Sequence, residues 1–180
     1  MKGCEKVETK STRRYSVKNV YLVGGTMGVG KTTVCQQLKR KLPNSVFLDG
    51  DWCWDADPFW VTEETKKMVL ENICFLLNQF IQCSVYDNII FCWVMHQQEI
   101  IDYIVEQLNK TDCKIRTISL TAKESELRER LKKDIEEGKR TEDILDRSIE
   151  RLACYNRLST VKIDTDKRSI EDIAEEIAKL

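Results

Sequence analysis

Short apolar runs alternate with longer amphipathic stretches along the chain from residue 18 onward. The apolar runs are typical of buried strands and lie at Lys18–Gly24, Ser45–Asp49, Asn88–Val94, Cys113–Leu120 and Thr160–Asp164. Stretches of helical composition follow them, at Gly30–Leu42, Thr62–Cys83, Gln97–Asn109, 124 to about Glu137, Thr141–Leu158 and from Ser169 onward. Because strands alternate with helices, the pattern predicts βαβ units and a mostly parallel sheet with helices on both faces.

Three of the helix starts carry N-capping patterns. A Ser or Thr side chain before a helix can accept a hydrogen bond from a free backbone N–H in the first turn. The candidates are Thr62, Thr121-x-x-Glu124 and Ser169-x-x-Asp172. We therefore expect helices to begin immediately after Thr62 and Ser169, and a charged helix to open with the Thr121–Glu124 capping box.

The composition narrows the class of protein. The chain has 180 residues, with 29 Lys and Arg against 30 Asp and Glu, which gives a net charge of −1. This balance argues against a nucleic-acid binder, which usually carries a basic footprint. The longest apolar run, Ile89–Met95, is far shorter than the ~20 residues that span a bilayer. We therefore expect no nucleic-acid or membrane partner, one domain over residues 18–180, and a flexible polar tail over residues 1–17.

Cysteine usage indicates the compartment. The chain has eight cysteines but no CxxC pair, and only one histidine, so a zinc ligand set is not expected. Cys74, Cys83 and Cys92 lie inside apolar runs, where a reduced thiol behaves as a small hydrophobic group. These features predict a reducing, cytoplasmic location.

The strongest motif joins the first strand to the first helix. Its residues fit G-x-x-x-x-G-K-[ST], a loop whose backbone N–H groups and helix dipole bind phosphate. The expected nucleotide-binding residues are Gly25, Thr26, Met27, Gly28, Val29, Gly30, Lys31, Thr32 and Thr33. Lys31 would add a full charge at the β- and γ-phosphates, and the Thr32 hydroxyl would ligate Mg²⁺. The alternative is a glycine-rich turn with an incidental lysine.

With this loop the sequence resembles the P-loop kinase group, which includes adenylate, shikimate, gluconate and adenylylsulfate kinases and some antibiotic phosphotransferases. The resemblance covers roughly residues 18–180. It implies an α/β fold of three α/β/α layers, the P-loop NTPase fold, with a five-stranded parallel sheet and a short lid at about residues 132–141. It also implies ATP and Mg²⁺ as cofactors.

The segment after the second strand, Asp49-Gly50-Asp51, resembles the Asp-x-Asp segment of shikimate, gluconate and adenylylsulfate kinases. The resemblance implies that Asp49 lies on the magnesium side. It implies that Asp51 orients the acceptor hydroxyl or takes its proton, and phosphoryl transfer needs such a carboxylate near the nucleophile. The alternative is a polar turn, because Asp-Gly is a common turn pair.

The third strand carries no Asp at its carboxyl end, since Asp87 comes before the strand. The Walker B carboxylate, which motor-type NTPases carry at this place, is therefore missing. Its absence favours a small-molecule kinase. His96, just after this strand, is a candidate acceptor contact, although a polar loop residue without a role is the more common case.

The acceptor side lacks arginine. Between Pro43 and Asn109 the only basic residues are Lys66 and Lys67, whereas kinases of anionic acceptors usually grip them with arginine. The region is instead acidic and aromatic, with Asp49, Asp51, Trp52, Trp54, Asp55, Asp57, Phe59, Trp60 and Trp93. This composition favours a neutral or cationic acceptor over a phosphorylated one, contacted by Asp51, Trp52, Trp93 and His96. The alternative is that the rings only pack under the long helix.

The region after the fourth strand is rich in basic residues and is interrupted by Gly138. Arg140 and Arg151 resemble the two lid arginines that contact phosphates in adenylate kinase, and Arg130 resembles the arginine that stacks on adenine there. The resemblance also places Asp164 and Thr165 in the loop that flanks adenine. A solvated charged helix is the alternative, and it is preferred for Arg128, Lys132 and Lys133.

The expected function is ATP-dependent transfer of the γ-phosphoryl group to a hydroxyl of a small molecule. One alternative is a regulatory NTPase whose output is binding or hydrolysis alone. The lack of a GTP-specificity signature after a later strand argues against it. The one matching segment, Asn109-Lys-Thr-Asp112, precedes the fourth strand and so lies at the wrong end of the sheet. A nucleoside or nucleotide kinase is the other alternative. The sequence leaves the acceptor and the oligomeric state open.

Overall fold

The computed structural model describes residues 17–180. The expected tail at residues 1–17 lies outside this range apart from Val17, so it stays a prediction. The five strands are β1 (Lys18–Gly24), β2 (Ser45–Asp49), β3 (Asn88–Trp93), β4 (Cys113–Thr121) and β5 (Val161–Asp164). The helices are α1 (Lys31–Lys41), the 3₁₀ turn η1 (Gly50–Cys53), α2 (Glu63–Gln82), α3 (Gln98–Gln107), α4 (Glu124–Glu136), α5 (Ile144–Arg157) and α6 (Ile170–Ala178).

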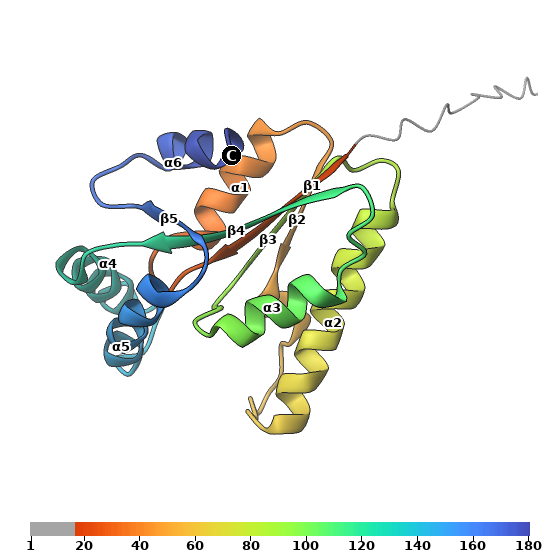
Figure 1. Ribbon diagram of the computed structural model, residues 1–180. Helices are drawn as coiled ribbons and strands as arrows, with labels where there is room; N and C mark the ends of the chain where they lie inside the picture. The colour runs from red at the N-terminus through yellow and green to blue at the C-terminus, as the bar shows by residue number, and fades with distance from the viewer. Residues whose placement is uncertain (1–16) are drawn as a thin grey trace, which may run out of the picture.

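The strands form one parallel sheet in the order β2-β3-β1-β4-β5, with β1 at its centre. Because every strand runs the same way, all carboxyl ends meet at one edge. Helices α1 and α6 cover one face of the sheet, and α2 and α3 cover the other (Figure 1). The predicted α/β/α fold with a five-stranded parallel sheet is confirmed.

The apolar strands are buried on both faces. Along β1, Val20 and Leu22 pack on the side of α2 and α3, whereas Tyr21 and Val23 pack on the side of α1 and α6. Successive side chains of a strand point to opposite faces, so a strand covered on both sides reads as a continuous apolar run. This is why the strands could be recognised from the sequence.

Two of the three expected N-caps are confirmed. Thr62 accepts a hydrogen bond from the Thr65 N–H at 3.2 Å, and Ser169 accepts one from the Asp172 N–H at 3.1 Å. The capping box at Thr121 is wrong. Thr121 is the last residue of β4, paired with Asp164 of β5, and α4 begins without a side-chain cap. Strand pairing outweighs the local capping preference here.

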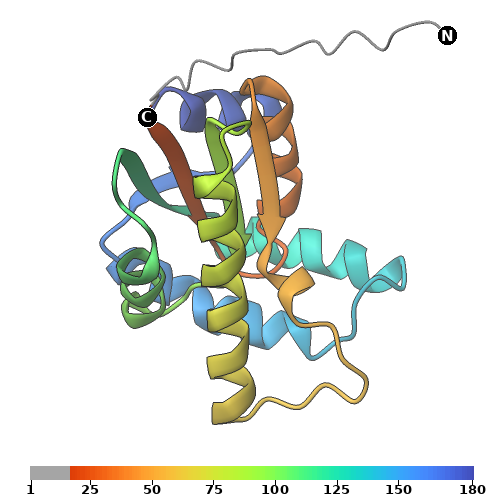
Figure 2. The ribbon, with the colours of Figure 1, turned by 90° about the vertical axis from the view of Figure 1, so that its right-hand side faces the viewer.

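The basic region forms a helical hairpin of α4 and α5 beyond the carboxyl ends of the strands (Figure 2). Gly138, at φ 69°, ends the first arm, as expected from the sequence. The second arm begins at Ile144 rather than Thr141, because residues 137–143 form the connecting turn. No helix in the described part of the chain is long and apolar enough to cross a membrane.

Candidate active site

The phosphate loop connects the central strand to α1. β1 ends at Gly24, and α1 begins at Lys31 with Gly30 as its N-cap residue. Gly28 and Gly30 have φ of 81° and 101°, which side-chain-bearing residues rarely adopt. A Cβ at Gly28 would lie 2.6 Å from Leu131 Cδ2 of α4. The backbone therefore curls as a phosphate loop requires, and it packs closely against the helical hairpin.

Lys31 points into the loop. Its Nζ donates to the Thr26 carbonyl at 3.0 Å, and the Thr26 hydroxyl donates to the Ser148 carbonyl of α5 at 2.9 Å. Burial lowers the pKa of the Lys31 ammonium, while the nearby Asp49 and Asp51 carboxylates act in the opposite direction. A half-buried cation in a glycine-rich loop at a helix N-terminus fits a polyphosphate, which would supply negative charge.

Asp49 lies beside Thr32, at the mouth of the loop. The Thr32 hydroxyl donates to Asp49 Oδ2 at 2.8 Å, and the Cys92 thiol donates to the same oxygen at 3.5 Å. The other carboxylate oxygen accepts the Asp51 N–H at 3.2 Å. Carboxylate and hydroxyl oxygens are hard ligands, so this pair fits Mg²⁺. The structure thus brings together the two residues expected to hold the metal.

Asp51 is held by a tryptophan. Trp93 Nε1 donates to Asp51 Oδ1 at 3.1 Å, and the Trp93 indole covers Gly50 so closely that a Cβ there would lie 2.4 Å from it. Partial burial raises the pKa of Asp51, and the neighbouring Asp49 carboxylate adds to the rise, against the opposing charges of Lys31 and Arg140. A carboxylate with a raised pKa is a better proton acceptor near neutral pH than an ordinary one.

One cavity of about 470 Å³ connects these groups, which is the size of an ordinary ligand pocket. Its lining includes residues of the loop, both aspartates, Val94 after β3, and side chains of the hairpin: Arg130, Lys133, Asp134, Glu137, Lys139 and Arg140. Lys133 is solvent-exposed as expected, and it also borders this cavity. Arg140 pairs with Asp134 at 3.0 Å and Lys139 with Glu137 at 2.5 Å.

Of the three residues expected at the adenine, Arg130 and Thr165 are in contact. The Arg130 guanidinium donates to Thr165 Oγ1 and to the Thr165 carbonyl, each at 3.0 Å, which ties α4 to the loop after β5. Thr165 is buried, whereas Asp164 is exposed and accepts the Asp166 N–H at 2.9 Å. Arg130 lines the cavity, but Asp164 and Thr165 do not.

Four other residues expected on the acceptor side or in the lid do not line this cavity: Trp52, Trp93, His96 and Arg151. Trp52 is 62% exposed, and its ring meets Phe47 edge to face at a centroid distance of 5.4 Å. His96 and Arg151 lie close to each other. Burial lowers the pKa of His96, and the Arg151 charge adds to this effect. His96 Nδ1 is buried without a hydrogen-bond partner among the described residues.

Sequence reasoning missed Cys92 and the acidic residues of the hairpin. Cys92 is paired in register with Asp49 at the carboxyl ends of neighbouring strands. That position in an apolar strand was a usable signal, because it predicts contact with the Asp-x-Asp segment. Asp134 and Glu137 gave no such signal, since acidic residues are common on any solvated helix.

Comparison with known proteins agrees with this geometry. The model of the AAA_18 family, described as an AAA domain, matches residues 22–151. This match covers well over half of the chain, so the protein belongs to that family. No curated protein matches the chain at a significant level.

Solved structures show the same fold. The tunicamycin resistance protein of Deinococcus radiodurans aligns over 90% of this chain and 94% of its own, with a TM-score of 0.70 and 18% identity. A gluconokinase from Sinorhizobium meliloti 1021 aligns over 90% of both chains, with a TM-score of 0.65 and 18% identity. A shikimate kinase from Acinetobacter baumannii aligns over 92% and 93%, with a TM-score of 0.58 and 19% identity. The fold is that of the P-loop kinases, as the sequence resemblance implied.

Proposed function

We propose that the protein is a magnesium- and ATP-dependent kinase that transfers the γ-phosphoryl group to a hydroxyl group of a small molecule. The observation that carries this proposal is the single cavity in which the phosphate loop, Asp49, Asp51 and the cations of the hairpin meet. Phosphoryl transfer depends mainly on positioning and charge neutralisation, and these groups supply both.

In this proposal Gly25–Thr33 bind the triphosphate, and Lys31, Arg140 and Arg151 spread the charge of the transferring group. Thr32 and Asp49 hold Mg²⁺, which neutralises charge on the phosphates when it is bound. Arg130 and the loop at Asp164 and Thr165 contact the adenine. Closure of the lid at residues 132–141 excludes water and limits hydrolysis.

Asp51 is proposed to orient the acceptor hydroxyl and to take its proton. The hydrogen bond from Trp93 fixes one of its oxygens, which leaves the other free to face the acceptor. The acceptor itself is proposed to be neutral or cationic, because Trp93 and Asp49 contact Asp51 and residues 45–97 contain no arginine.

The direct test is ADP production from ATP with a panel of small hydroxyl compounds. We expect slow turnover without acceptor and a marked increase with one class of hydroxyl compound. Fast phosphate release that no compound stimulates would instead support a regulatory NTPase. Turnover that requires a nucleoside or nucleoside monophosphate would support the nucleoside or nucleotide kinase alternative.

A further inference from the structure

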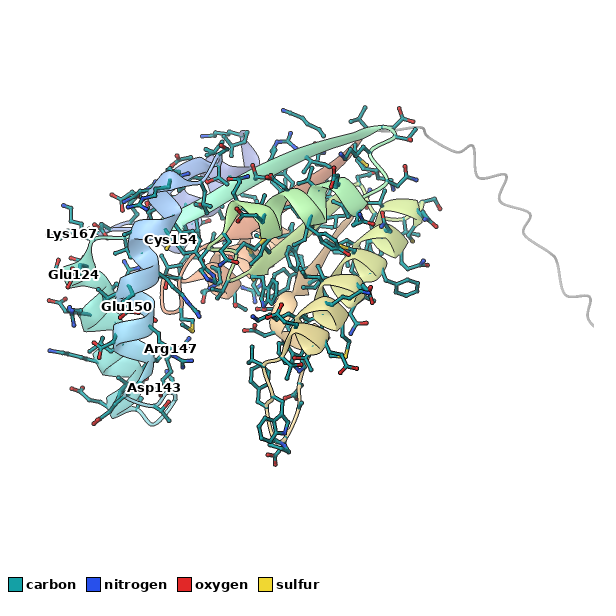
Figure 3. All side chains as sticks on the ribbon, turned by 60° about the horizontal axis from the view of Figure 1, so that its bottom comes forward. Glu124, Asp143, Arg147, Glu150, Cys154 and Lys167 are labelled. Atoms are coloured by element: carbon teal, nitrogen blue, oxygen red, sulfur yellow. The ribbon has the colours of Figure 1, made fainter. Side chains whose placement is uncertain are left out.

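The segment that follows Asp51 projects from the body of the protein. Residues 51–62, here called the aromatic loop, extend beyond the carboxyl edge of the sheet together with the first turn of α2 (Figure 2). Figure 3 shows this loop separate from the hairpin that carries Asp143 and Arg147. Trp60 is 67% and Phe59 58% exposed. Large rings exposed together on a monomer usually mark a binding site.

Three of the four tryptophans of the chain line one groove in this loop. The groove has a volume of about 530 Å³, and Trp52, Trp54, Trp60 and Met68 contribute its apolar walls. Trp54 stacks on Phe59 at a centroid distance of 4.4 Å, and the Trp60 carbonyl accepts a hydrogen bond from Thr65 at 2.9 Å. These contacts hold the rings in place without filling the groove.

The charge around the groove is negative. Asp55 is the one charged side chain among the described residues that line it, and Asp57 is exposed nearby. The two lysines of this region do not offset them, because Lys66 pairs with Glu63 and Lys67 lies 3.8 Å from Glu71. Several tryptophan faces beside a carboxylate attract an alkylated ammonium ion, through its charge and through its methyl or methylene surface.

We propose that this groove binds the ammonium group of the phosphoryl acceptor, which is therefore an amine-bearing alcohol. The inference rests on the proposed kinase function and adds the class of its substrate. The groove begins at Trp52, the residue next to Asp51 in η1. In this proposal, an acceptor whose ammonium group lies among the tryptophans extends past Trp52 and brings its hydroxyl to Asp51.

The binding step is tested without any phosphoryl transfer. The full chain is titrated with tetramethylammonium chloride, and with sodium chloride at the same ionic strength, while tryptophan fluorescence is recorded. We expect a saturable change with tetramethylammonium alone. Trp60→Ala and Trp60→Leu should each weaken its Kd roughly 2- to 30-fold, since leucine keeps apolar area but has no π face. Phe75→Ala is the matched control, because Phe75 is a 63% exposed ring on α2 that does not line the groove.

The catalytic step is tested with two acceptors of the same shape. One is ethanol bearing a trimethylammonium group, and the other is its neutral isostere bearing a tert-butyl group. We expect a lower KM for the ammonium compound in ADP production, and Trp60→Leu should remove that advantage. Thermal melting of each variant shows that the fold is intact.

Three results would overturn the inference in distinguishable ways. Equal use of both alcohols without saturable tetramethylammonium binding would refute the ammonium groove and leave the kinase function standing. Saturable binding without phosphorylation of any hydroxyl compound would refute the kinase function and the acceptor role together. Concentration-dependent self-association that Trp60→Ala abolishes, without ammonium binding, would make the groove an interface between copies of the chain.

Discussion

The two sides of the cavity are built in different ways. On the nucleotide side, backbone conformation and buried polar contacts determine the site: Gly28 and Gly30 at positive φ, and Lys31 bound to a loop carbonyl. On the proposed acceptor side, Asp51 is followed by a projecting loop of exposed rings and carboxylates, such as Trp60. The difference teaches that the phosphate loop is shaped by the fold, whereas the proposed acceptor site depends on side chains that the fold leaves free.

The largest expected effect separates transfer from nucleotide binding. Asp51→Asn keeps the shape and an acceptor for the Trp93 hydrogen bond but removes the base, so we expect phosphoryl transfer to fall by about 10²–10⁴-fold. Nucleotide affinity should remain nearly unchanged. Acceptor-dependent ADP production and a nucleotide titration measure the two quantities. Normal transfer by this variant would refute the role assigned to Asp51.

Lys31→Ala should damage both functions, because Lys31 belongs to the nucleotide side. We expect the transfer rate to fall by about 10²–10³-fold, as for one strong electrostatic group, and nucleotide affinity to fall with it. Lys132→Ala is the matched control, since Lys132 is exposed on α4 and does not line the cavity. Equal effects of the two substitutions would contradict the specific role of Lys31.

Two glycines of the phosphate loop test how closely this loop packs against α4. Gly28→Ala and Gly30→Ala both place a side chain at positive φ, a strain of about 1–3 kcal/mol. Only at Gly28 does the new Cβ also meet Leu131, whereas nothing lies within 4 Å at Gly30. We therefore expect chemical denaturation to show the larger loss of stability for Gly28→Ala. The reverse order would mean that the loop does not pack on α4 as described.

The smallest effect concerns pH. The raised pKa of Asp51 means that the folded protein binds this proton more tightly than the unfolded chain, so stability is lost as pH rises through the folded pKa. Asparagine does not ionise, and we expect Asp51→Asn to melt slightly higher than the wild type at pH 7. This difference should disappear below the ordinary Asp pKa of about 3.9. A difference in melting temperature that stays constant at all pH values would mean that packing, and not the Asp51 pKa, causes it.

The same pKa determines an activity profile. If Asp51 takes the acceptor proton as proposed, kcat/KM of the wild type should fall on the acid side at a pH above the ordinary Asp range. A profile that falls only at the pKa of an ordinary carboxyl would show that the neighbouring Asp49 charge and the partial burial do not affect the reacting group.

Much of the fold was predictable because its signals are local. Continuous apolar runs identify strands buried on both faces, and the glycines before Lys31 identify the phosphate loop without knowledge of packing. The start of α4 at Glu124 was predicted correctly, but the loss of its cap was not, since pairing of Thr121 with Asp164 involves a strand distant in the sequence. Local capping rules carry no information about such a competing partner.

The site was predictable in its residue types but less in its arrangement. Thr32 and Asp49 meet as expected, because the carboxyl ends of parallel strands share one edge. The Trp52 ring packs edge to face against Phe47 and does not line the cavity, which the sequence does not reveal. The place of Lys133 in the cavity depends on how α4 rests on Gly28, which no short sequence pattern encodes.

The most direct test of the account is a calorimetric titration of the full chain with ATP at millimolar magnesium. The account predicts one saturable binding event that Asp51→Asn retains and Lys31→Ala weakens strongly. Absence of any heat with every purine nucleoside triphosphate would contradict the claim that the loop between β1 and α1 binds a triphosphate, and the roles assigned around the cavity would fall with it.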